Sequence, residues 1–89
     1  MTRTKLKIIN KLGLHARAAA KLVATASQFE CTILIVHNDS EVNGKSIMGI
    51  MMLAAGIDSE LELITQGTDE QAAADAIKAL VDDRFGEDE

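Results

Sequence analysis

The chain has 89 residues, a formal net charge of −5 at pH 7, one cysteine and two aromatic residues, both phenylalanine. A chain of this length forms one domain, so we expect residues 1–89 to build a single core. The acidic balance and the scarcity of aromatic rings argue against a nucleic-acid surface, which needs basic patches and stacking rings. No apolar run approaches the roughly 18 residues of a membrane span, and the N-terminus lacks a signal-peptide core. We therefore expect a cytoplasmic protein without membrane insertion.

The first half of the chain predicts a strand, a helix and a hairpin. Residues Lys5–Ile9 alternate polar and apolar side chains, as a half-buried strand does. After a loop at residues 10–13, an alanine-rich stretch over about residues 16–27 places apolar side chains at helical spacing. β-branched residues then predict a strand at Cys31–His37, and a polar turn leads to a short strand at Glu41–Asn43.

The second half predicts a short helix, a strand and a longer helix. Residues Ser46–Ala55 form the short helix, with Gly56 as its left-handed cap, and Glu60–Thr65 alternates as a strand. The stretch Thr68–Gln71 matches a capping box that opens an amphipathic helix ending before Gly86. Strands with one apolar face covered by amphipathic helices make a two-layer α+β domain.

The segment Gly13–Arg17 places an imidazole, His15, at the expected start of the first helix. The free amide groups and positive end of a helix favour an anion, and Arg17 can donate charge-assisted hydrogen bonds to phosphate oxygens. The same positive end disfavours imidazolium and leaves a neutral, nucleophilic ring. This arrangement suits reversible attachment of a phosphoryl group. On physical grounds alone, a helix-capping His15 beside a solvated Arg17 fits equally well.

Two motifs carry a resemblance that covers nearly the whole chain, from Lys5 to about Phe85. The motifs Gly13–Arg17 and Asn43–Gly49, at this separation, resemble those of HPr, the phosphocarrier family of the bacterial phosphotransferase system. The resemblance implies an open-faced sandwich: a four-stranded antiparallel sheet of order 1-4-2-3, covered on one face by three helices. It also implies a phosphoryl group on the δ nitrogen of His15, stabilised by Arg17. We expect no cofactor and a monomer.

The same resemblance implies the direction of transfer. An enzyme I-type phosphoprotein, charged originally from phosphoenolpyruvate, would donate the phosphoryl group to His15, and a histidine of an EIIA-type protein would accept it. The backbone amides of Ala16 and Arg17 would be further donors to the phosphoryl oxygens. Phosphohistidine serves here as an intermediate of group transfer, so the chain would be a carrier and not a free-standing enzyme.

Position 18 indicates which branch of the family the chain resembles. The family usually has proline after the arginine, whereas this chain has Ala18. The stretches Ala18–Leu22, Lys45–Gly56 and Asp83–Gly86 are more similar to NPr, the nitrogen-related branch. Alanine is favourable inside a helix, so the chemistry should survive the difference. We therefore expect a regulatory relay in place of sugar uptake.

The short helix after Ser46 has apolar side chains on two sides. One side carries Ile50, Leu53 and Ala54, and the other carries Ile47, Met48 and Met51. Flexible methionines suit a surface that meets several partners, so the second side is a candidate docking patch, as the HPr resemblance also implies. A small domain could instead bury both sides. A competing function is a non-catalytic regulatory module that binds targets through this patch.

Four other features of the sequence could carry chemistry. Ser46 is expected to cap the short helix, and the resemblance adds a possible regulatory phosphorylation there. The stretch Gly44–Ser46 copies the end of a P-loop but lacks the earlier glycine. His15, Cys31 and His37 lack close ligand spacing, so we expect no metal site. The acidic residues near the C-terminus are expected to form a solvated face.

Overall fold

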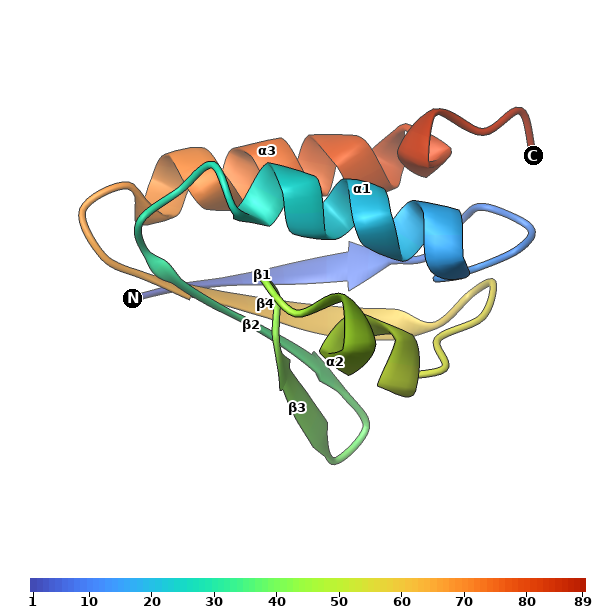
Figure 1. The fold of residues 1–89 in the computed structure, drawn as a ribbon, viewed down its shortest axis with the longest axis horizontal. Coiled ribbons are helices and arrows are strands. Elements are labelled where there is room, and N and C mark those ends of the chain that lie inside the picture. Colours follow the sequence, from blue (N-terminus) through green and yellow to red (C-terminus); the bar gives the residue numbers. More distant parts are fainter.

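The computed structural model describes all of residues 1–89 and contains four strands, three α-helices and a final 3-10 turn. In chain order these are β1 (Thr2–Lys7), α1 (Ala16–Ala26), β2 (Thr32–His37), β3 (Ser40–Asn43), α2 (Ile47–Met52), β4 (Glu60–Gln66), α3 (Glu70–Asp82) and η1 (Arg84–Gly86). The strands form one antiparallel sheet in the order β1-β4-β2-β3, and the helices cover one of its faces (Figure 1). The expected open-faced α+β sandwich and its strand order are confirmed. All three helices are too short or too polar to span a bilayer.

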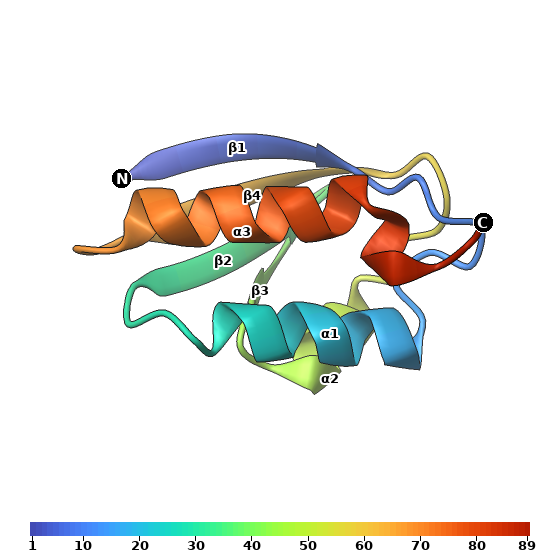
Figure 2. The same cartoon turned by 90° about the horizontal axis from the view of Figure 1, so that it is seen from above.

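The core lies between the sheet and the helices. Strand alternation turns every second side chain toward the helices, and α1 and α3 lie side by side above them (Figure 2). Burying these faces stabilises the fold by roughly 25 cal/mol for each Å² of apolar surface removed from water. The fully buried large apolar side chains are Ile8, Leu22, Ile33, Ile35, Ile50, Leu63, Ile77, Val81 and Phe85.

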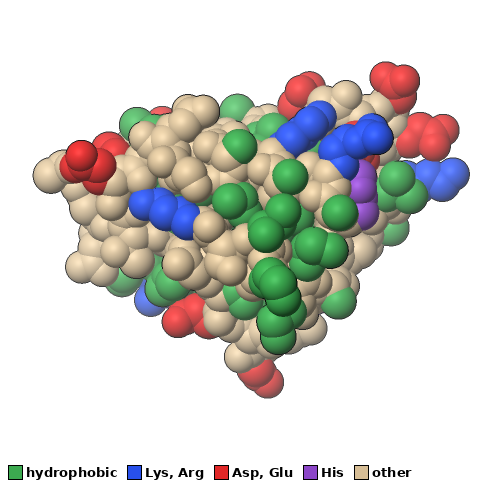
Figure 3. Space-filling model, viewed as in Figure 1, with side chains coloured by type: hydrophobic (Ala, Val, Ile, Leu, Met, Phe, Trp, Pro, Cys, Tyr) green, Lys and Arg blue, Asp and Glu red, His purple; other side chains and the backbone are tan.

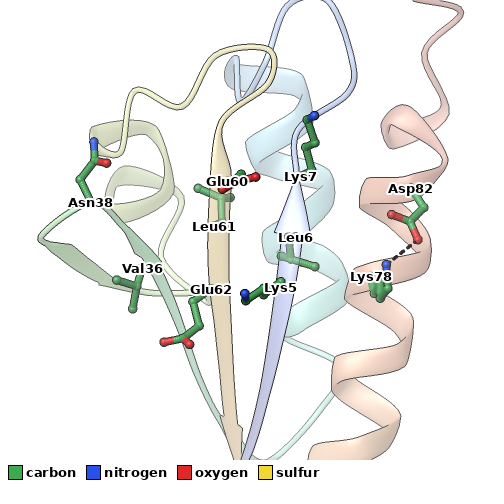
Figure 4. Close-up of a pocket in the computed structure, with 10 residues that line it drawn as sticks. All are labelled: Lys5, Leu6, Lys7, Val36, Asn38, Glu60, Leu61, Glu62, Lys78 and Asp82. Carbon is green, nitrogen blue, oxygen red and sulfur yellow. Dashed lines mark hydrogen bonds and ion pairs between the residues drawn. The ribbon is translucent and has the colours of Figure 1, made fainter.

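The other face of the sheet is uncovered and carries opposite charges on neighbouring strands. Lys5 lies opposite Glu62 in the register of β1 and β4, and Lys7 lies opposite Glu60. A hollow of about 420 Å³ opens at this face and reaches the ion-paired Lys78 and Asp82 of α3, whose charged atoms are 3.0 Å apart (Figure 4). Each cation around this hollow has an acidic neighbour, either in an ion pair or opposite it on the next strand.

Three predicted elements have boundaries that are wrong by more than one residue, and one of them is the last helix, which ends at Asp82 with the 3-10 turn η1 between it and the expected end at Gly86. Alternation predicts the first strand at Lys5–Ile9, but the strand runs over Thr2–Lys7, because pairing with β4 from Thr2 onward includes polar residues that carry no apolar signal. The short helix ends at Met52 and not at Ala55, and Ala54, with φ 51°, takes the left-handed conformation expected of Gly56. The remaining strand limits and the end of α1 differ from the prediction by at most one residue.

The predicted capping box at Thr68–Gln71 is also wrong. Helix α3 begins at Glu70 with Asp69 in the N-cap position, and Asp69 makes no capping hydrogen bond. Its carboxylate instead accepts hydrogen bonds from the amides of Glu30, at 2.8 Å, and Cys31, at 2.9 Å. Thr68 is therefore not the cap, and the side chain in the N-cap position links the start of α3 to the loop before β2.

Candidate functional site

The loop between β1 and α1 has a fixed shape that places His15. Gly13 has φ +66°, and a Cβ atom there would lie 2.6 Å from the carbonyl oxygen of Ala55. The amide of Leu14 donates to that same carbonyl at 2.9 Å, and the Leu14 side chain is buried. The position of His15 is therefore set by Leu14, whose backbone is hydrogen-bonded to the segment after α2 and whose side chain is buried.

His15 occupies the N-cap position of α1 with an extended backbone, but its side chain makes no capping hydrogen bond. The first helical bond runs from the amide of Ala19 to the carbonyl of His15, at 2.8 Å, so the amides of Ala16 and Arg17 have no acceptor in the helix. The imidazole is 27% exposed. A ring at this place can reach solvent next to free donors, and its role is not that of a helix cap.

The two ring nitrogens of His15 have different surroundings. Nε2 lies 2.5 Å from Oε2 of Glu87, whereas Nδ1 makes no hydrogen bond within the protein. The other oxygen of Glu87 accepts a hydrogen bond from Nδ2 of Asn10 at 3.0 Å. Burial opposes ionisation of Glu87, but the hydrogen bonds from His15 and Asn10 hold the pKa of its carboxyl below the ordinary value. Glu87 is only 14% exposed, so the expected solvated face at the C-terminus is wrong for this residue.

The C-terminal segment reaches His15 because it is fastened at several points. The Phe85 side chain is fully buried, and its carbonyl accepts a hydrogen bond from Nζ of Lys21 at 2.7 Å. Further along, the amide of Lys11 donates to the carbonyl of Glu89 at 3.0 Å. The chain end thus lies beside the loop that precedes α1, as Figure 2 shows. Sequence reasoning missed this contact, for which the only signal was a lone aromatic residue near an acidic end.

A hollow of about 780 Å³ opens beside the ring. Its walls are formed by Lys11, Leu12, His15, Ala16, Arg17, Glu87, Asp88 and Glu89. The three residues that the sequence singled out for phosphoryl chemistry therefore line one space. Arg17 is exposed and has no carboxylate within ion-pair distance, so its guanidinium is free to meet an anion.

The exposed side of α2 adjoins this region. Ser46 caps the helix, since its Oγ accepts a hydrogen bond from the amide of Gly49 at 3.1 Å. Ile50 and Leu53 are buried, whereas Ala54, expected with them, is exposed. The exposed side chains form what we call the apolar patch: Ile47, Met48, Met51 and Met52, with Met48 and Met52 exposed by 70% and 78%. Figure 3 shows hydrophobic side chains gathered beside a histidine that has basic and acidic neighbours. The domain does not bury both sides of this helix.

The family follows from a comparison with known proteins. A family model described as "PTS HPr component phosphorylation site" matches residues 2–83. The chain belongs to the HPr family. Members of this family are phosphocarriers of the phosphotransferase system, and the predicted resemblance is confirmed.

Individual HPr proteins agree with this assignment. The chain is 53% identical to phosphocarrier protein HPr of Neisseria meningitidis serogroup A and 54% identical to that of Cupriavidus necator, with full coverage of both chains in each case. It is 46% identical to phosphocarrier protein NPr of Shewanella violacea, over 93% of this chain and 91% of that one. Among solved structures, HPr-C-His from Thermoanaerobacter tengcongensis superposes with a TM-score of 0.96 at 42% identity, and each chain is fully covered.

The remaining candidate residues of this HPr-family chain lie away from the hollow. Cys31 is buried, and the structure contains no group of three or more histidine, cysteine or acidic residues that could hold a metal ion. Nδ1 of His37 lies 3.2 Å from the carbonyl oxygen of Leu53, at the end of α2. Both residues are accounted for by packing and local hydrogen bonding.

Proposed function

We propose that the chain carries a phosphoryl group on Nδ1 of His15, taken from the phosphohistidine of an enzyme I-type protein and passed to a histidine of an EIIA-type protein. The observation that carries the proposal is the ring itself. One nitrogen is held by Glu87, and the other is free beside Arg17 and the first amides of α1. Membership of the HPr family supports the same conclusion.

The transfer needs no cofactor and no proton release from His15. The lone pair of Nδ1 forms a bond to phosphorus while the nitrogen–phosphorus bond on the donor breaks, and the electron pair of that bond returns to the donor ring. Arg17 and the amides of Ala16 and Arg17 bind the phosphoryl oxygens, whose charge they stabilise during transfer. In the second transfer the acceptor nitrogen attacks phosphorus, and the pair returns to Nδ1.

The apolar patch on α2 is the proposed docking surface for both partners. It lies beside the hollow, and its methionines can adapt to two different protein surfaces. Ala18 after the arginine, together with the 46% identical NPr relative, supports a regulatory, nitrogen-related relay. We further propose that the carrier acts as a cytoplasmic monomer, because each partner must reach His15 in turn.

Mass spectrometry tests the carrier function directly. After incubation with phosphoenolpyruvate and an enzyme I-type donor, the protein should gain one phosphoryl group that is lost on acid treatment. His15→Ala should gain none, whereas His37→Gln, which changes the other histidine, should gain one. Persistent labelling of His15→Ala would show that another residue carries the group.

The apolar patch also favours a second candidate, a regulatory module that binds targets without transfer. The two candidates differ in how they depend on His15. An EIIA-type protein should become phosphorylated only by the wild-type carrier if the relay is correct. Equal binding and regulation of that target by wild type and His15→Ala, without any transfer, would favour the module.

Ser46 is proposed as a regulatory phosphorylation site. Its Oγ lies at the start of α2 next to the apolar patch, so a phosphate there would add about two negative charges to the docking surface. Incubation with an HPr serine kinase and ATP should give an acid-stable phosphate that is absent from Ser46→Ala. An unmodified wild-type protein would remove Ser46 from the proposal.

A further inference from the structure

The contact between Glu87 and His15 belongs to a short hydrogen-bonded chain that begins at a buried side chain. Asn10 is 0% exposed, and its Nδ2 donates to the carbonyl of Gly13 at 2.8 Å and to Oε1 of Glu87 at 3.0 Å. Both partners accept only, so the amide nitrogen must face them. Oε2 of Glu87 then lies 2.5 Å from Nε2 of His15. Hydrogen bonds thus connect the loop to Asn10, Asn10 to Glu87 near the chain end, and Glu87 to the imidazole.

The side-chain amide of Asn10 is only half satisfied. Oδ1 of Asn10 is buried and has no hydrogen-bond partner, the only side-chain atom of the protein in that position. Leaving a buried acceptor unpaired costs on the order of 1–3 kcal/mol. Two hydrogen bonds of Nδ2 offset this cost: one holds the carbonyl of Gly13 in the loop, and the other orients the carboxylate that contacts His15.

From this geometry we propose that Asn10 and Glu87 are positioning residues for phosphoryl transfer. Asn10 orients Glu87, and Glu87 holds the His15 ring with its Nε2 hydrogen bound and its Nδ1 lone pair free. An ionised carboxylate can only accept, so the hydrogen between the two groups belongs to Nε2. The role rests on the proposed function to the extent that Nδ1 is the nitrogen that attacks phosphorus.

The carboxylate also compensates charge during the transfer. When Nδ1 forms its bond to phosphorus, Nε2 keeps its hydrogen and the ring gains positive charge. Glu87 lies against the nitrogen that shares this charge, as the carboxylate of a carboxylate–histidine pair does. Its loss should therefore slow phosphorylation even when the ring stays in place.

The first test is spectroscopic and needs no partner protein. In ¹⁵N-labelled wild-type protein, the hydrogen on Nε2 of His15 should give a downfield resonance that exchanges slowly with water. Glu87→Gln should lose it, because Asn10 and His15 contact different oxygens of Glu87, and a glutamine side chain in that position presents an acceptor oxygen to only one of them. Glu41→Gln makes the same charge change at an exposed site on β3 and should retain it. Absence of the resonance in the wild type, or its persistence in Glu87→Gln, overturns the proposal.

The second test measures reactivity with phosphoramidate, a small donor that transfers its phosphoryl group as ammonia leaves. The wild type should be modified on Nδ1, and Glu87→Gln should react about tenfold more slowly or worse. Glu41→Gln should match the wild type. The positioning role is refuted if phosphoramidate modifies Nε2 in the wild type, or if Glu41→Gln and Glu87→Gln react with phosphoramidate at equal rates. Failure of an enzyme I-type donor alone would instead count against the proposed partner.

A double-mutant cycle separates Asn10 from Glu87. If Asn10 acts through Glu87, adding Asn10→Ala to Glu87→Gln should slow the phosphoramidate reaction little beyond Glu87→Gln alone. Independent, multiplicative effects would show that Asn10 acts by another route. The Glu87→Gln measurements decide the role of Glu87 even where Asn10→Ala disturbs the loop.

Discussion

Replacing Gly13 with alanine should destabilise the protein and disturb the loop that holds His15. The new Cβ would lie 2.6 Å from the carbonyl oxygen of Ala55 and 2.7 Å from Cα of Gly56, both backbone atoms that cannot rotate away. Residue 13 would also have to keep φ near +66°, which costs a non-glycine residue about 1–2 kcal/mol.

The clash adds to this backbone cost. Moving residue 13 away from Ala55 stretches the 2.9 Å hydrogen bond between the Leu14 amide and the Ala55 carbonyl, a bond worth about 0.5–1.5 kcal/mol. The expected loss is therefore about 2–3 kcal/mol. For a domain of this size, about 1 kcal/mol lowers Tm by roughly 4–8 °C, so thermal unfolding should occur roughly 10–20 °C earlier.

Gly56→Ala is the matched control. A Cβ on Gly56 would meet nothing within 4 Å, and its φ lies outside the left-handed region, so its effect should stay within about 0.5 kcal/mol. Both variants are compared by thermal and urea unfolding, and by phosphorylation with an enzyme I-type donor, which should slow only in Gly13→Ala. Equal stabilities for the two variants would refute the argument that the loop before α1 is fixed by its contact with Ala55.

Three further predictions concern docking, acid stability and the thiol. Met48→Asp should raise the KM for the enzyme I-type donor about tenfold, because it puts a charge in the apolar patch. The rate with phosphoramidate, which needs no docking, should stay unchanged. Equal losses in both assays would contradict a docking role. Hydrogen bonds from Thr2 and the Gly67 amide lower the pKa of Glu70 to about 2. Because this pKa is lower in the folded protein, ionised Glu70 stabilises the fold fully above pH 4.5, and this stabilisation should disappear as the pH falls toward 2. In urea titrations over that pH range, Glu70→Gln should lose less stability than the wild type. An identical pH dependence in the two proteins would contradict the stabilising role of ionised Glu70. Burial, aided by the Asp69 carboxylate, raises the pKa of the Cys31 thiol, so a thiol reagent should react only as the protein unfolds; rapid labelling of the native protein would be inconsistent with this.

The sequence by itself determined the elements, their layering and the reactive segment. Alternation in β4 and helical spacing in α1 show which side chains are buried on one face of each element. Burial of one face repeats at the period of the strand or helix, so it can be read from the order of residues. The segment at residues 13–17 could be recognised for the same reason, because its glycine, histidine and arginine act on their immediate neighbours. The strand order came from family resemblance, since alternation does not say which strand lies beside which.

Only the tertiary structure decided the groups that meet across long separations. Asp69 starts α3 but binds amides 38 and 39 residues away. Glu87 fits a solvated tail in the sequence but lies against a ring 72 residues earlier. A polar side chain takes whichever partner the packed chain brings near it, and no local periodicity records that choice. The imidazole could therefore be found from the sequence, whereas the carboxylate that holds it required the fold.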